Sequence, residues 1–145
     1  MTDSKAVVRA FFDRLNAHDL DGAAGLMIAD CVHHTTGLGD GDVRGRQGWR
    51  TMVQSLWKSF PDRRLEVHHI IGEGDRVAAR LTWTGTHRGD YAGIAPTGRA
   101  VEVNGISVFH LKDGLIAVQW IEQDILALHQ QLGAAPGHSD NWPKL

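Results

Sequence analysis

The fold is decided by residues 60–133, which read FPDRRLEVHHIIGEGDRVAARLTWTGTHRGDYAGIAPTGRAVEVNGISVFHLKDGLIAVQWIEQDILALHQQLG. Apolar and polar residues alternate through this stretch, as they do in strands with one buried face. We expect strands over residues 65–71, 77–87, 99–111 and 115–123. The turn at Lys112-Asp113-Gly114 carries an Asp-Gly pair, which is a strong hairpin signal. The stretch therefore predicts a meander of long antiparallel strands.

The residues that flank this meander have the spacing of helices. Apolar residues recur every three to four positions after Ser4, after Asp19 and over residues 47–59. Asp124 can cap a last short helix over residues 125–132. Helices first, long strands next and a short helix last is the order of an α+β domain. His33 and His34 fall between the second and third helices, in a short strand or turn.

Length and composition predict one domain over residues 1–133, followed by a loosely ordered tail over residues 134–145. The formal net charge is -2 and the cations form no run, which argues against nucleic acid and anionic membranes as partners. Cys31 is the single cysteine, so no internal disulfide is possible. No leader pattern and no apolar run of ~20 residues is present. We expect a cytoplasmic protein.

Five tryptophans in 145 residues indicate a wide apolar interior or cleft, although ordinary core packing explains them equally well. No metal is expected. His68 and His69 are adjacent in a predicted strand and therefore point to opposite faces, so they cannot chelate together. No dinucleotide-binding glycine motif follows a strand, and we expect no bound cofactor.

Short motifs recur in a fixed order along the meander. They are Phe60-Pro61-Asp62, Gly85-Thr86-His87, Pro96-Thr97-Gly98-Arg99, Asp113-Gly114 and Gln131-Leu132-Gly133. This set resembles the SnoaL-like polyketide cyclases of the nuclear-transport-factor-two-like superfamily. The resemblance implies a curved antiparallel sheet wrapped around the N-terminal helices, a cone-shaped α+β barrel with one apolar pocket. It also implies a homodimer or higher homo-oligomer, usually formed through the sheet.

Cyclases of this family close a ring by intramolecular aldol chemistry, in which one carboxylate acts as base and then as acid. Aligned from Asp113-Gly114 without gaps, the family's catalytic Asp falls on Ile121. Its pocket Gln and His fall on Gly105 and Ser107, and its Asn falls on His33. Of the family's polar pocket residues, only the one at His87 is kept. The resemblance therefore implies the fold and the pocket without the usual cyclase carboxylate.

Three residues are candidates for handling protons. His33 faces the pocket in the family and titrates near neutral pH, but a hydrogen-bonded structural role is an equal alternative. His87 ends a predicted strand in phase with Trp83, where simple polar satisfaction is the alternative. Asp124 can supply a carboxylate, and an N-cap is the competing interpretation.

The candidates for substrate contact are aromatic, apolar or hydrogen-bonding residues on the strands and the third helix. Ser107 and Gln119 can each bond a ketone or phenol oxygen, or simply bond each other. The full set is Trp57, Trp83, Ser107, Phe109, Gln119, Trp120 and Ile121.

Three functions remain open. The first is a cofactor-independent tailoring enzyme that closes, isomerises or hydroxylates a planar aromatic polyketide. The second is a hydroxylase that works with a separate reductase, as a sister group of the family does. The third is a small-molecule binding protein that uses the same cavity without catalysis.

Overall fold

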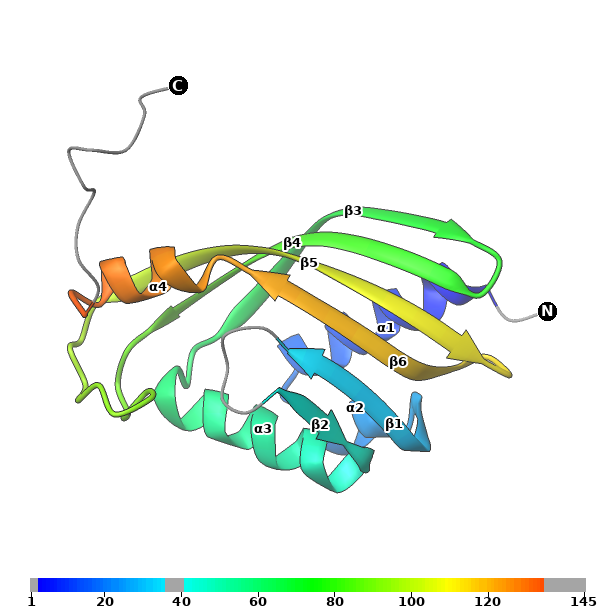
Figure 1. Cartoon of the computed structure of the whole chain (residues 1–145), viewed down its shortest axis with the longest axis horizontal. Helices are drawn as coiled ribbons and strands as arrows, with labels where there is room; N and C mark the ends of the chain where they lie inside the picture. The colour runs from blue at the N-terminus through cyan, green and yellow to red at the C-terminus, as the bar shows by residue number, and fades with distance from the viewer. Residues whose placement is uncertain (1–2, 36–40, 135–145) are drawn as a thin grey trace.

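Figure 1 shows the structure, a computed structural model that describes residues 3–35 and 41–134. A curved sheet forms one layer, and helices cover its concave side. The elements in chain order are α1 (Ser4–Asn16), α2 (Leu20–Ala24), β1 (Met27–Thr35), β2 (Asp42–Arg44), α3 (Gly45–Ser59), β3 (Arg64–Glu73), β4 (Arg76–Thr86), β5 (Ala100–Lys112), β6 (Leu115–Gln123) and α4 (Ile125–Gln131). None of the helices in the described ranges is long and apolar enough to cross a membrane.

The six strands form one sheet in the order β2-β1-β6-β5-β4-β3. The four strands expected from the sequence are present as β3 to β6, and each pairs antiparallel with the next. The turn between β5 and β6 places Asp113 and Gly114 at φ values of 51° and 78°, as a two-residue hairpin turn requires. The α+β class and the curved sheet are therefore confirmed.

The sheet departs from the expected all-antiparallel arrangement at β1. This strand lies parallel to β6, with His33 opposite Gln119, and β2 pairs with its other edge. The sheet is mixed and remains open, because β2 and β3 end its two edges. Alternation in sequence reveals a strand but not a partner some ninety residues away, so this pairing was not predictable. The helix α2 is shorter than the sequence pattern predicted. That pattern included Met27, which in the structure is the first residue of β1.

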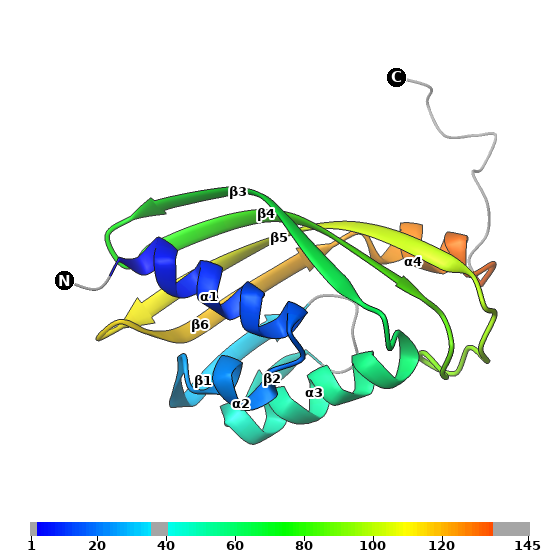
Figure 2. The ribbon, with the colours of Figure 1, turned by 180° about the vertical axis from the view of Figure 1, so that it is seen from behind.

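Helix α1 lies along the concave face of the sheet (Figure 2), and its apolar residues, Phe11 and Phe12 among them, are buried in the core. Asp3 caps α1 by accepting a hydrogen bond from the backbone N–H of Lys5 at 3.0 Å. Phe11 and Phe12 of α1 each place their ring 5.8 Å from the ring of Phe109 in β5. Edge-to-face contacts of this kind lock helix and sheet together and fix the walls of the space between them.

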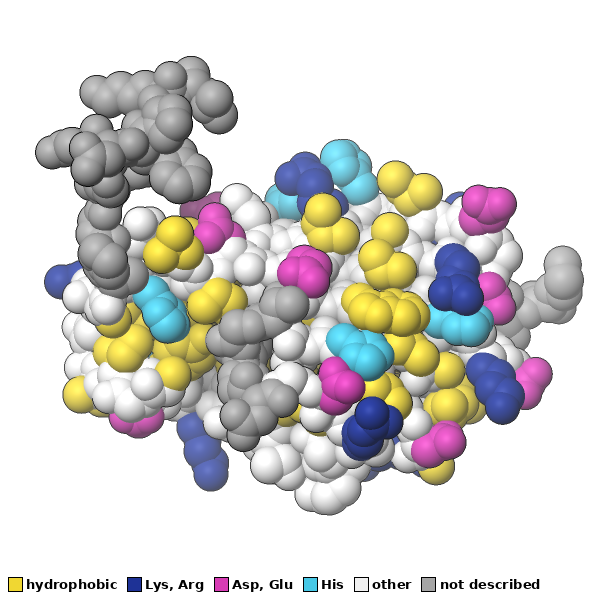
Figure 3. All heavy atoms as spheres, viewed as in Figure 1, with side chains coloured by type: hydrophobic (Ala, Val, Ile, Leu, Met, Phe, Trp, Pro, Cys, Tyr) yellow, Lys and Arg dark blue, Asp and Glu magenta, His cyan; other side chains and the backbone are white. Residues whose placement is uncertain are grey.

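No helix of the described chain crosses the middle of the convex face of the sheet (Figure 1). Apolar side chains gather on this face over β3, β5 and β6 (Figure 3). Ile71 is 71% exposed, Ile106 50%, Val108 37% and Trp120 37%. The last described element, α4, ends at Gln131, and the expected tail over residues 134–145 lies outside the described residues except for residue 134.

Candidate functional site

A small cavity lies between the helices and the concave face of the sheet, and its volume is about 60 Å³. Its walls are mainly aromatic and aliphatic, with a few polar groups. The lining comprises Phe11, Phe12, Leu15, Trp49, Met52, Val53, Leu56, Arg63, Leu65, Leu81, Trp83, Gly105, Ile106, Ser107, Gln119, Ile121, Glu122 and Gln123. A larger open groove of about 910 Å³ lies at the far end of the molecule, among turn residues near Asp3 and Gly114.

Strand alternation decides which side chains reach the cavity. Ser107 of β5 pairs with Ile121 of β6, and both lie on the concave face. Gly105 leaves no room for a side chain, because a β-carbon there would lie 2.9 Å from the backbone oxygen of Glu122. The position that carries a Gln in the resembling cyclases is thus closed to any side chain in this packing.

A hydrogen-bonded chain of three polar side chains crosses the floor of the site. Nδ1 of His33 lies 2.8 Å from Oε1 of Gln119, and Nε2 of Gln119 donates to Oγ of Ser107 at 3.2 Å. All three residues are buried. With Gln119 oriented in this way, Nδ1 of His33 carries the hydrogen and its Nε2 has a free lone pair. The expected alternative, in which Ser107 and Gln119 bond each other, is thus part of the chain.

His33 lies directly behind the lining, between Gln119 and the ring of Trp49, whose centroid is 6.3 Å away. Burial lowers the pKa of His33 below its ordinary value of 6.5. Its Nε2 is buried and has no hydrogen-bond partner among the described residues. His33 is therefore a neutral imidazole with an unused basic nitrogen.

Arg63 is a lining residue that sequence reasoning missed. Its guanidinium carbon lies 4.8 Å from the centroid of the Trp83 ring, a cation–π contact. Its Nε is buried without a hydrogen-bond partner, and the structure gives it no ion pair with a described carboxylate. Strand alternation did not identify it, because Arg63 precedes the expected strand over residues 65–71.

Trp83 forms the wall beside Arg63, and its ring is held from two sides. The indole Nε1 donates to Oε1 of Gln123 at 3.0 Å. The ring of Phe60 meets it edge-on at 5.1 Å. The expected placement of Trp83 in the pocket wall agrees with this arrangement.

His87 is fully buried but is not part of the cavity lining. The backbone N–H of Thr97 donates to its Nδ1 at 3.1 Å, and Oγ1 of Thr97 lies 3.0 Å from the same nitrogen. These bonds fasten β4 to the loop that follows it. The polar-satisfaction interpretation accounts for Nδ1 alone, because Nε2 of His87 is buried and has no hydrogen-bond partner among the described residues.

Asp124 and Phe109 also lie outside the lining. Asp124 is exposed and accepts the backbone N–H of Ala127 at 3.0 Å, so it caps α4 as the competing interpretation held. Phe109 is fully buried within the core formed with α1.

Two expected contact tryptophans lie elsewhere. Trp57 stacks on His18 with 4.3 Å between ring centroids and packs, partly buried, against the core without lining the cavity. Trp120 lies on the convex face, because it is adjacent to Ile121 in a strand and must point the other way. Its ring stacks on His34 at 5.7 Å.

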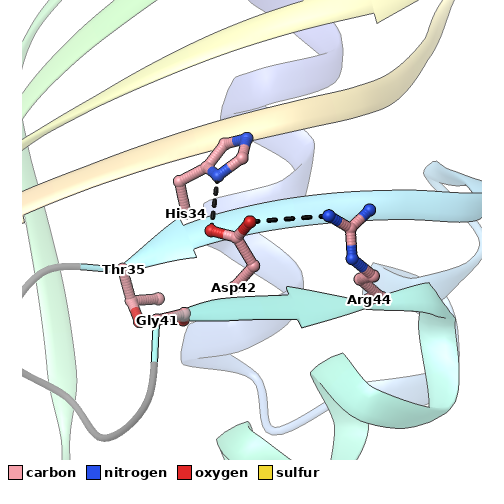
Figure 4. A network of polar contacts seen from close by, with 5 residues as sticks. All are labelled: His34, Thr35, Gly41, Asp42 and Arg44. Carbon is pink, nitrogen blue, oxygen red and sulfur yellow. Dashed lines mark hydrogen bonds and ion pairs between the residues drawn. The ribbon is translucent and has the colours of Figure 1, made fainter.

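His34 belongs to a surface network at the β1–β2 edge (Figure 4). Its Nδ1 lies 2.6 Å from Oδ1 of Asp42, and Nη2 of Arg44 lies 3.5 Å from the other carboxylate oxygen. This network is exposed and separate from the cavity. The described part of the chain contains no group of three His, Cys, Asp or Glu side chains placed to hold a metal ion.

The chain is similar to known proteins in sequence and in fold. The family model of SnoaL-like polyketide cyclases matches residues 5–132. The aklanonic acid methyl ester cyclase AcmA of Streptomyces galilaeus is 30% identical over 145 residues, which cover 99% of this chain and 96% of AcmA.

Two solved structures are similar at the same level. AclR of Streptomyces galilaeus, a hydroxylase candidate, is 31% identical with a TM-score of 0.82, covering 94% of this chain and 89% of its own. IdmH of Streptomyces antibioticus, a polyketide cyclase candidate, is 30% identical with a TM-score of 0.80, covering 90% of this chain and 99% of its own. The relatives thus share one fold but are named for two different reactions, cyclisation and hydroxylation.

Proposed function

The chain belongs to the SnoaL-like polyketide cyclase family, and we propose that it is a tailoring enzyme that acts on a planar, apolar polyketide or related aromatic substrate in the concave-face cavity. The observation that carries this proposal is the lining itself. Trp49 and Trp83 offer flat apolar walls, and Ser107 and Gln119 offer a fixed pair of hydrogen-bonding groups between them. Apolar walls with a few placed polar groups are typical of small-molecule sites.

The polar chain can orient a ketone or phenol oxygen of the substrate. Gln119 is held at its oxygen by His33 and at its nitrogen by Ser107, which leaves the Ser107 hydroxyl hydrogen free to donate. His33 positions Gln119, and its neutral Nε2 is the basic nitrogen we propose for proton transfer. A general base is typically worth ~10²–10⁴-fold in rate.

The isoleucine at position 121 bears on which of the family's reactions this protein can catalyse. Its side chain lines the cavity where the resembling cyclases carry their catalytic Asp, and an isoleucine accepts no proton. Glu122 is the acidic member of the described lining, and its side chain is exposed, beside the exposed Ile106 across the strands. This favours isomerisation or hydroxylation over the carboxylate-based aldol closure. Hydroxylation inserts one atom of molecular oxygen into the substrate and reduces the other atom to water, and we propose that a separate reductase supplies the two electrons this needs.

The cavity must widen when substrate binds. Its volume of about 60 Å³ is well below the ~300–1,000 Å³ of ordinary ligand pockets. Met52, Leu56 and Arg63 are partly exposed lining residues whose side chains have several rotatable bonds. We propose that these side chains move apart to admit the rings. The catalytic proposal leaves out His87 and Asp124, whose contacts serve the fold.

The exposed convex face supports a second part of the proposal, a homo-oligomer formed through the sheet. Ile106, Val108 and Trp120 lie close together on β5 and β6, and Ile71 extends the apolar surface onto β3. Contiguous apolar surface of this kind commonly marks a protein interface.

The first experiment offers the purified protein aklanonic acid methyl ester, the compound named for AcmA, with and without a reductase and NADPH. Products are separated by mass. Gain of one oxygen atom only when the reductase is present supports hydroxylation, whereas an isomer of unchanged mass supports ring closure or isomerisation. Binding of the compound without any product supports a binding protein instead, which Ile121 at the position implied for the cyclase Asp also favours.

Variants test whether the polar chain takes part. Ser107→Ala removes the free hydroxyl donor, and we expect kcat/KM to fall about tenfold. His34→Ala, on the opposite face of the same sheet, is the matched control and should be fully active. Equal activity of Ser107→Ala and the control would remove the polar chain from the mechanism.

A further inference from the structure

Arg63 introduces a positive charge into an otherwise apolar wall. Four arginines elsewhere in the described chain lie within ion-pair distance of an aspartate: Arg14, Arg44, Arg50 and Arg76. Arg63 differs from them in that its Nε is buried and has no hydrogen-bond partner among the described residues. Its interaction with the protein is the contact with the Trp83 ring.

The Arg63 side chain is partly exposed, but the N–H at its buried Nε has no acceptor, so the desolvation of that group is not offset by a hydrogen bond. Burial lowers the pKa of Arg63 to about 10, so the guanidinium stays protonated at neutral pH. A neutral side chain of similar length would fill the same wall without this penalty. The charge therefore calls for a partner that the described protein does not supply.

We propose that Arg63 binds an anionic oxygen of the substrate, so that the substrate class is a planar aromatic that carries a carboxylate or an ionised phenol or enol. The guanidinium presents a planar fork of donors, which matches a carboxylate or a delocalised oxyanion. This inference rests on the proposed function, since it places the anion in the same cavity.

The neighbouring side chains fit this role. Trp83 holds the guanidinium from one side, and the bond from its indole to Gln123 fixes the ring that Arg63 covers. Ser107 and Gln119 line the same cavity from β5 and β6. A flat substrate can therefore place an uncharged oxygen on the polar pair and an anionic oxygen on Arg63.

The test measures binding of three probes by quenching of tryptophan fluorescence. The probes are anthraquinone-2-carboxylate, its neutral carboxamide, and 2-hydroxyanthraquinone titrated through ionisation of its phenol. We expect the wild-type protein to bind the carboxylate about ten- to a hundred-fold more tightly than the carboxamide. Tighter binding only of the ionised phenol would identify the anion as a phenolate.

Arg63→Met keeps the length of the side chain and removes the charge, and should abolish the preference for the anion while leaving carboxamide binding unchanged. Arg63→Lys keeps the charge without the fork and should retain part of the preference. Arg64→Met is the matched control, because Arg64 is the adjacent arginine and is exposed. It should leave both affinities unchanged.

The outcomes separate this inference from the proposed function. Equal binding of the charged and neutral probes by the wild-type protein would overturn the role of Arg63 and leave the aromatic pocket standing. Binding of none of the probes would count against the pocket itself and against the inference with it. The comparison of probes on the wild-type protein decides the matter even if Arg63→Met does not fold.

Discussion

His33 and His34 are neighbours in β1, yet they belong to different faces of the sheet. His33 is fully buried, and its Nδ1 bonds an amide oxygen of Gln119. His34 is partly exposed, bonds the carboxylate of Asp42 and stacks on Trp120. The same residue type thus meets a neutral partner inside and a charged partner outside.

The contrast extends over the whole sheet. On the concave face, polar side chains are few, buried and bonded to one another, which is the condition for a precise binding site. On the convex face, apolar side chains are exposed and ion pairs are solvated, which suits association with another surface. Changes on the concave face should therefore alter folding and ligand binding, and changes on the convex face should alter assembly.

The largest difference is expected between Phe109→Ala and Val108→Ala, which are adjacent in β5. Phe109 is fully buried, so its truncation should lower the free energy of unfolding by about 3–5 kcal/mol. Val108 is 37% exposed, and its truncation should cost about 1 kcal/mol or less. Urea denaturation of dilute protein measures both. Similar losses for the two variants would show that the faces do not differ as described.

A smaller difference is expected between the two histidine partners. Gln119→Leu leaves Nδ1–H of His33 without an acceptor in a buried site and should cost about 1–3 kcal/mol. Asp42→Asn weakens an exposed pair with His34 and should cost ~1 kcal/mol at most. The same denaturation experiment compares them, and a larger loss for Asp42→Asn would contradict the assignment of the buried chain.

The pH dependence of stability sharpens the comparison further. Burial lowers the pKa of His33 in the folded state, so the unfolded chain takes up a proton more readily. His33 therefore contributes stability above its ordinary value of 6.5, and that contribution is lost as pH falls below 6.5 through the depressed value. His33→Gln should flatten the decline in unfolding free energy below this pH. His34→Gln leaves His33 in place, so the fall in unfolding free energy at low pH should persist in this variant. If the fall disappeared in His34→Gln, His33 would not be its cause.

The smallest effect on folding is expected on the convex face. Ile106→Lys places a charge on a side chain that is 50% exposed, and should change the free energy of unfolding by less than about 0.5 kcal/mol. It should nevertheless dissociate the proposed homo-oligomer, because the charge would be buried in the interface. Analytical ultracentrifugation checks this. An oligomer of unchanged size would show that the chain assembles through another surface.

Much of the fold could be predicted from local patterns. The four strands of the meander, the Asp113-Gly114 turn and the cap at Asp124 each depend on residues close together in the sequence. The parallel pairing of β1 with β6 could not be predicted in this way, because nothing near His33 identifies Gln119 as its partner. Pairing between distant strands is a property of the assembled sheet.

The site was predictable where strand parity was applied. Trp83, Ser107 and Ile121 line the cavity, as their alternation indicated. Trp120 could not share that face with Ile121, and parity alone excludes the pair.

Helix and loop residues were harder to place. Trp57 of α3 stacks on His18 instead of lining the cavity, and the sequence pattern did not reveal that contact. Arg63 follows a Pro-Asp turn, where an arginine normally points to solvent. Only the packing against Trp83 and the absence of a carboxylate partner in the described chain make it distinctive.

A crystal structure of the protein grown with anthraquinone-2-carboxylate would locate the ligand directly. We predict that the rings occupy a widened cavity between Trp49 and Trp83, with a ring carbonyl at Ser107 and the carboxylate at Arg63. The side chains of Met52 and Leu56 should be displaced from their present positions. A ligand bound only at another surface, with the cavity still closed at about 60 Å³, would contradict the concave face as the site of function.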